Sequence, residues 1–220
     1  MVSAGRRDWF RNHDWSPEIE SEFFKRLGRA REYGRAQYLR VQAAELVSCG
    51  KASLAEVAID LIDRMLREYP KNRCEKAIAW YLRADSLIVL GRIDQALESF
   101  RQAMRAQREC PSFSTNAHLD FLYHTAVNSR HELYDEAMEY LREFDRAISS
   151  ELYPVHGFRR NAALALIYAD RGDEAAASLA TAALAYADAK SSGLSRHPEL
   201  GLVGAVDPIL LRRLTSLSRP

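Results

Sequence analysis

The chain has 220 residues, enough for one compact domain or one helical solenoid. Its 31 Lys and Arg residues nearly balance its 30 Asp and Glu residues, so it lacks the basic excess of a general nucleic-acid-binding protein. A hydrophobic content of 47% excludes a disordered chain. The 3 cysteines form no metal-ligand spacing, and an odd number suits free thiols in a reducing compartment.

The N-terminal sequence and the apolar runs predict a cytoplasmic protein. The first ten residues, MVSAGRRDWF, lack the apolar core of a signal peptide. The longest uninterrupted apolar run covers residues 162–169 and is far too short to cross a bilayer. We therefore expect neither a membrane nor a nucleic acid among its partners.

Residues 1–15 form a polar arm without helical periodicity, in which three aromatic side chains stand out. Trp9, Phe10 and Trp15 could insert into a partner, or they could fold back over the first helix. Folding back is favoured because an exposed aromatic cluster is costly unless it is used.

Two helices are predicted after this arm. Ser16 is a candidate N-cap, and Pro17 suits the first helical position. Gly34 is a candidate break before a second helix over 35–48. The first helix carries an apolar stripe at helical spacing, made by Ile19, Phe23, Phe24, Leu27 and Ala30.

The next helix has the clearest period in the chain. Gly50 precedes it, Ser53 and Glu56 form a possible capping box, and Pro70 ends it. Its apolar residues alternate by three and four positions: Leu54, Val57, Ala58, Leu61, Ile62, Met65, Leu66 and Tyr69.

The stretch over 80–103 shows the repeating unit best. A large residue and a small one are followed by a glycine turn and a second helix with small residues on one face. This pattern predicts two helices packed closely and antiparallel. The residues concerned are Trp80, Ala84 and Leu87, then Gly91, then Ala96, Phe100 and Ala103.

This arrangement resembles the tetratricopeptide repeat (TPR), a helix–turn–helix unit of about 34 residues. A third unit is expected over 114–148, with 128–130 in place of the glycine turn, and a fourth over 155–189 with a turn at Gly172. The spacing between equivalent alanines is 38, 41 and 40 residues, which is longer than the TPR period and overlaps that of HEAT repeats. These alanines are Ala58, Ala96, Ala137 and Ala177.

The predicted fold is all-α: a right-handed α-solenoid of about four antiparallel TPR-like helix pairs, with an extra N-terminal helix and a short C-terminal capping helix that starts at Asp207 and Pro208. The predicted organisation is an arm over 1–15, a repeat domain over 16–189, and a loop with the capping helix over 190–220. The whole chain also resembles a bacterial group of TPR-containing proteins without an assigned activity, on three segments: DWFRNHDWSPEIESEFF, RAQYLR and RHPELGLVG.

No motif predicts catalysis. His131 and Glu132 match half of a zinc-protease HExxH motif, but Asp135 stands where the second histidine belongs. His118, His124 and His131 are six and seven residues apart, whereas a metal pair on one helix face needs three or four. We therefore expect a non-enzymatic protein without a metal site or cofactor.

The resemblance implies that the first helix of each pair lines a concave groove that holds a protein or peptide partner. The groove is expected to contain Arg40, Val47, Tyr81, Asp85, Ile88, Tyr123, Val127, Arg159 and Leu166. This set lacks the clamp of Lys, Asn and Arg residues that some family members use for a C-terminal carboxylate. The expected function is an adaptor or scaffold; the alternative is an antitoxin, immunity or peptide-sensing protein that binds and blocks one partner.

Overall fold

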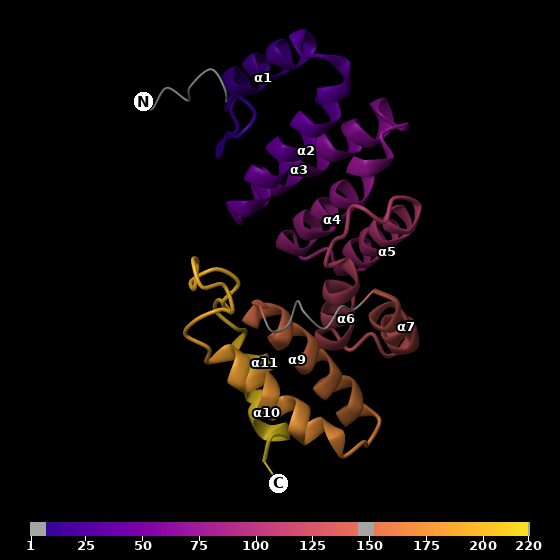
Figure 1. Ribbon diagram of the computed structural model, residues 1–220, viewed down its shortest axis with the longest axis vertical. Coiled ribbons are helices and arrows are strands. Elements are labelled where there is room, and N and C mark those ends of the chain that lie inside the picture. Colours follow the sequence, from indigo (N-terminus) through magenta and orange to yellow (C-terminus); the bar gives the residue numbers. More distant parts are fainter. Residues whose placement is uncertain (1–7, 145–151, 220) are drawn as a thin grey trace. The chain divides into compact units, whose positions relative to one another are not determined.

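A computed structural model describes residues 8–144 and 152–219 (Figure 1). Within these ranges the chain forms ten α-helices and one 3-10 helix and contains no strand, which confirms the predicted all-α class. The helices are α1 (Pro17–Arg29), α2 (Glu32–Ser48), α3 (Ala52–Glu68), α4 (Arg73–Val89), α5 (Ile93–Glu109), α6 (Ala117–Val127), η1 (His131–Leu133), α7 (Tyr134–Phe144), α9 (Pro154–Asp170), α10 (Ala175–Ala187) and α11 (Pro208–Leu217).

The chain divides into two compact units, Met1–Ala117 and His118–Pro220. In the first unit, α2 packs on α3 and α4 packs on α5, while α4 also contacts both α2 and α3. Large side chains fill this layer of helices; those that are almost completely buried include Phe23, Leu39, Leu46, Ile62, Met65, Leu87 and Phe100.

The aromatic arm folds back onto the first unit, as the sequence predicts. The Trp9 ring centroid lies 5.4 Å from that of Phe23 and 5.1 Å from that of Tyr38. The Trp15 centroid lies 5.5 Å from that of Phe23. Phe10 also packs against this core. These rings therefore cover one face of α1 and α2.

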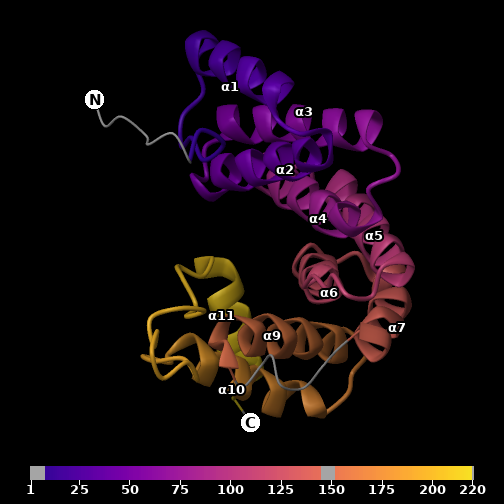
Figure 2. The same ribbon diagram turned by 45° about the horizontal axis from the view of Figure 1, so that its top comes forward.

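The second unit contains α6, α7, α9, α10 and α11. Phe121 of α6 meets Tyr140 of α7 edge to face, with ring centroids 5.3 Å apart. Helix α11 packs on both α9 and α10 (Figure 2), and Asp207 caps it by accepting hydrogen bonds from the backbone of Ile209 and Leu210. A capping helix therefore covers the last hairpin, as expected.

Three helix–turn–helix connections share one backbone geometry. At Gly91 and Gly172 the backbone is left-handed, with φ of 71° and 72°, and Ser129 adopts a φ of 51° at the corresponding place. In each case the next residue donates a hydrogen bond of 2.9 Å to the carbonyl five residues earlier. This is the Schellman ending, which closes the last helical turn, so residues 128–130 do replace the glycine turn.

Ion pairs also recur between successive hairpins. Arg92 donates to Glu56 at 2.5 Å, and Arg171 donates to Asp135 at 2.7 Å. The partners are 36 residues apart in both pairs. The contacts between hairpins therefore repeat along the chain, together with the turns inside them.

Two predicted helix signals are wrong. Gly34 lies inside α2, which starts at Glu32, and a methyl group at Gly34 would lie 3.2 Å from the Tyr38 ring; this glycine permits a close approach and does not break the helix. The predicted capping box of Ser53 and Glu56 also does not form, because α3 starts one residue before Ser53 and makes no side-chain cap.

The alanine register holds in three repeats and shifts in the fourth. Ala58, Ala96 and Ala137 are completely buried at helix contacts. In α10 the buried residue at this position of the repeat is Ala176, whereas Ala177 is half-buried. The expected end of the third unit at residue 148 lies outside the described residues.

Among the described residues, no helix combines the length and the apolar character needed to cross a membrane.

Candidate functional site

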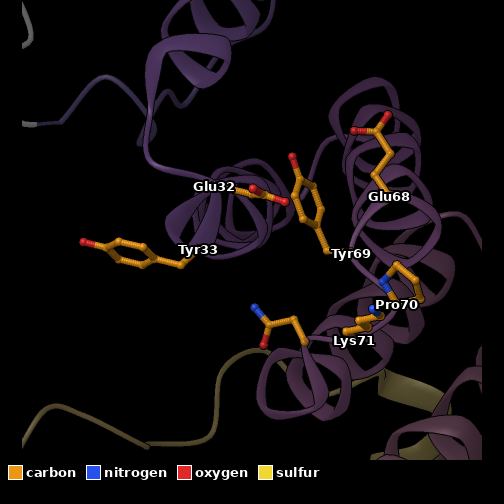
Figure 3. Close-up of a pocket in the computed structure, with 7 residues that line it drawn as sticks. Glu32, Tyr33, Glu68, Tyr69, Pro70 and Lys71 are labelled. Atoms are coloured by element: carbon orange, nitrogen blue, oxygen red, sulfur yellow. The ribbon is translucent and has the colours of Figure 1, made fainter.

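A pocket of about 730 Å³ opens in the first unit, between the start of α2 and the connection from α3 to α4. Figure 3 shows the Glu32 carboxylate pointing toward the Tyr69 ring, whereas the Tyr33 side chain extends from α2 in the opposite direction. Tyr33 is 76% exposed, so folding leaves most of its surface available. The lining residues are Glu32, Tyr33, Glu68, Tyr69, Pro70, Lys71 and Asn72.

The pocket mixes aromatic surface with charged and amide groups. Glu68 is held by Arg64 one helical turn earlier, with 2.8 Å between Nε and the carboxylate. Pro70 stops α3, because its ring removes a backbone donor, and the chain then turns into α4. Tyr33 belongs to α2 and Tyr69 is the C-cap of α3, so only the packing of α2 near the α3–α4 connection brings them to one pocket.

The predicted groove residues of the first unit lie on α2 and α4. Tyr81, Asp85 and Ile88 are half-buried on α4. The Tyr81 ring centroid lies 5.9 Å from that of Phe100, a buried residue of α5. Tyr81 is therefore anchored by the second helix of its own hairpin and presents only part of its ring.

Arg40, a predicted groove residue, has an ion-pair partner on the next hairpin. Its guanidinium forms an ion pair with Glu75 of α4. The two side chains are 17% and 14% exposed, respectively. Arg40 therefore links the first helices of two successive hairpins, and the sequence analysis did not identify Glu75 as its partner.

In the second unit the structure brings two predicted groove residues together. The Arg159 guanidinium carbon lies 5.9 Å from the Tyr123 ring centroid, and Arg159 also forms an ion pair with Asp120 of α6. The Asp120 side chain is 2% exposed and that of Arg159 is 34% exposed. Burial is the main reason why the pKa of Tyr123 is raised, although Arg159 opposes this shift.

His124 follows Tyr123 in α6, and their rings meet edge to face at 5.3 Å. Burial lowers the pKa of His124 to about 4, because the charged imidazolium is poorly solvated there. The charge of Asp120 raises the pKa of His124, whereas the charge of Arg159 lowers it further. His124 is thus neutral at physiological pH.

One predicted groove residue is buried, and His131 packs against an aromatic ring. Leu166 is 1% exposed in α9 and belongs to the core, so its assignment to the groove is wrong. His131 stacks on Tyr134 with ring centroids 5.1 Å apart and lies 3.5 Å from Asp170. In the described part of the chain, no group of three or more His, Cys, Asp or Glu side chains is arranged to hold a metal ion.

Four residues of these sites were not predicted as site residues: Tyr33, Tyr69, Glu75 and Asp120. Tyr69 appeared only as the last member of an apolar stripe, and Tyr33 adjoins a glycine that suggested a break. A weak signal for Asp120 exists, since it is the one acidic residue in the helix over 117–127.

Comparison with protein-family models, with curated proteins and with solved structures finds no match to this chain.

Proposed function

We propose that this protein is a non-enzymatic interaction module, an adaptor or scaffold built as a TPR-like, right-handed α-solenoid of about four helix pairs. Support comes from the recurrence of the Schellman turns and of the ion pairs between hairpins. In a solenoid, each unit buries its faces against its neighbours, and the stack leaves an extended surface for binding. The proposed partner is a peptide segment of another protein.

The observation that carries the proposal is the pocket beside Tyr33 and Tyr69. A tyrosine that is 76% exposed keeps its contact area for a partner, and tyrosine is frequent among binding hot spots because a rigid ring supplies area at low entropy cost. Glu32, Lys71 and Asn72 add charged and hydrogen-bonding groups at the same pocket. Aromatic area with a few polar groups suits one side chain of an extended peptide.

The proposed peptide continues from the pocket along α2 and α4. Tyr81 and Asp85 are four residues apart, so they share a helix face, and the Arg40–Glu75 pair joins α2 to α4. The half-buried Tyr81 ring is held in place by Phe100, which keeps it rigid for contact with a peptide.

The test is selection from a random peptide library on the immobilised full chain, followed by affinity measurements with the selected peptides. We expect an enriched motif whose binding weakens at least tenfold in Tyr33→Ala, with an unchanged melting temperature because the ring is exposed. Ile209→Ala, in the second unit, removes another exposed apolar side chain and is the matched control. Failure to enrich any motif, or equal binding by both variants, would contradict the proposal.

A further inference from the structure

Two of the three cysteines lie side by side in the first unit. Cys74 is in the first turn of α4, and Cys110 is the C-cap of α5. Because α4 and α5 form a hairpin, the start of one helix lies beside the end of the other. The two sulfur atoms are 3.2 Å apart as free thiols, and both side chains are half-buried.

The geometry points to a redox-active dithiol: we propose that Cys74 and Cys110 form a reversible disulfide that joins the ends of the α4–α5 hairpin. A disulfide bond is about 2.05 Å long, so the sulfurs must approach by only about 1.2 Å. Both residues lie at helix ends, where the backbone adjusts more easily than inside a helix.

The third cysteine provides an internal comparison. Cys49 ends α2, and its thiol lies 3.4 Å from the backbone carbonyl oxygens of His13 and Glu45, to which it donates. Its position is thus explained by contacts to the backbone. Cys74 and Cys110 instead have each other as hydrogen-bond partners.

Glutathione disulfide is the proposed oxidant. The thiolate of one cysteine attacks a glutathione sulfur, which forms a mixed disulfide and releases one glutathione thiolate. The second cysteine, after losing its proton, attacks the protein sulfur of that mixed disulfide, which forms the Cys74–Cys110 bond and releases the second glutathione. The protein loses two hydrogens, and one glutathione disulfide is reduced to two glutathione molecules.

The hydrogen bond to Cys110 raises the pKa of the Cys74 thiol. Since the thiolate is the attacking species, exchange should be faster at mildly alkaline pH than at neutral pH. The closed bond would span 36 residues, and a loop of this size restricts the unfolded chain. We therefore expect the melting temperature of the oxidised protein to rise by roughly 5–10 °C.

The experiment incubates the native full chain with excess glutathione disulfide, alkylates the remaining thiols and maps the products by mass spectrometry. We expect one alkylated cysteine, Cys49, and a peptide pair that links Cys74 to Cys110 and separates on reduction. Cys49→Ser should form the same bond. Cys74→Ser and Cys110→Ser should each stop at a mixed disulfide with glutathione and show no rise in melting temperature.

The same reaction in concentrated urea shows whether the folded geometry selects the pair. In an unfolded chain, the loop between Cys49 and Cys74 closes more readily than the loop between Cys74 and Cys110, because it is shorter. The proposal is supported if the Cys74–Cys110 bond is the main product in the native state and is no longer the main product in urea. Three alkylated thiols in the oxidised native protein, a bond to Cys49, or a bond between two chains would overturn it.

Discussion

Each unit of this protein contains an ion pair between two helices, but the two pairs differ in how deeply their charged groups are buried. In the first, Arg40 of α2 pairs with Glu75 of α4, and both side chains are about equally shielded. In the second, Arg159 of α9 pairs with Asp120 of α6, where the acid is almost completely buried and the arginine is one-third exposed. The comparison teaches that the cost of breaking an ion pair depends on where the remaining charge is left.

The largest expected effect is that of Arg159→Ala. This change leaves the Asp120 carboxylate in a buried position without its arginine, and breaking a buried pair from one side destabilises strongly. We expect a loss of about 3 kcal/mol in the free energy of unfolding, measured by urea denaturation. Arg40→Ala should lose less, about 1 kcal/mol, because the acid that it leaves behind, Glu75, is 14% exposed, whereas Asp120 is 2% exposed.

Adding Asp120→Asn to Arg159→Ala sharpens this prediction. The double variant removes the buried charge, so its loss should be smaller than the sum of the two single losses. Equal losses for Arg159→Ala and Arg40→Ala would show that burial of the acid does not distinguish the two units.

The second prediction concerns acid stability in the second unit. His124 has a folded-state pKa of about 4, below its ordinary value of 6.5. The unfolded chain therefore takes up a proton that the folded chain excludes, and stability falls as the pH drops from about 6.5 to about 4. The expected contribution is about 3 kcal/mol at the acid end.

The His124 contribution is isolated by comparison with His124→Gln, whose side chain stays neutral. The difference in unfolding free energy between the two proteins should change by about 3 kcal/mol between pH 7 and pH 4. A constant difference across this range would contradict the assigned burial of the imidazole.

The third prediction compares two helical glycines. A methyl group at Gly157 of α9 would lie 2.5 Å from Cζ of Tyr186 in α10, whereas one at Gly28 of α1 would have nothing within 4 Å. Gly157→Ala should therefore overpack the hairpin and destabilise by about 2 kcal/mol. Gly28→Ala should be neutral or stabilising by up to about 1 kcal/mol, because alanine favours a helix. Thermal and urea unfolding of both variants measure this; equal effects would mean that α9 and α10 separate easily.

Much of the fold follows from local patterns, because helical periodicity and glycine turns act over a few residues. The turns at Gly91 and Gly172 were predictable in this way. The packing of Trp9 onto the first helix was predictable for another reason, the cost of leaving an aromatic cluster exposed. Gly34 was misassigned because glycine both ends helices and permits close contacts, and only the position of Tyr38 decides between the two.

The candidate site was less predictable, because its parts are distant in sequence. Glu75 lies 35 residues from Arg40, and Asp120 lies 39 residues from Arg159. Which residues pair over such separations depends on how one hairpin stacks on the next, and no local sequence pattern predicts that stacking. Tyr33 and Tyr69 line one pocket for the same reason. A helix-face argument finds residues such as Tyr81 but not the pockets that form between helices.

The smallest expected effect is also the most specific, because it has opposite signs in two turns that share one geometry. The backbone at Ser129 is left-handed, like that at Gly91, and this conformation costs a residue with a Cβ about 1 kcal/mol relative to glycine. Ser129→Gly should therefore stabilise the second unit by about 1 kcal/mol, and Gly91→Ala should destabilise the first by a similar amount. Neither change should alter helix content by circular dichroism, since each turn keeps its hydrogen bonds. If Ser129→Gly instead destabilises the protein, the serine side chain or the flexibility of the glycine outweighs backbone strain, and the equivalence of the two turns fails.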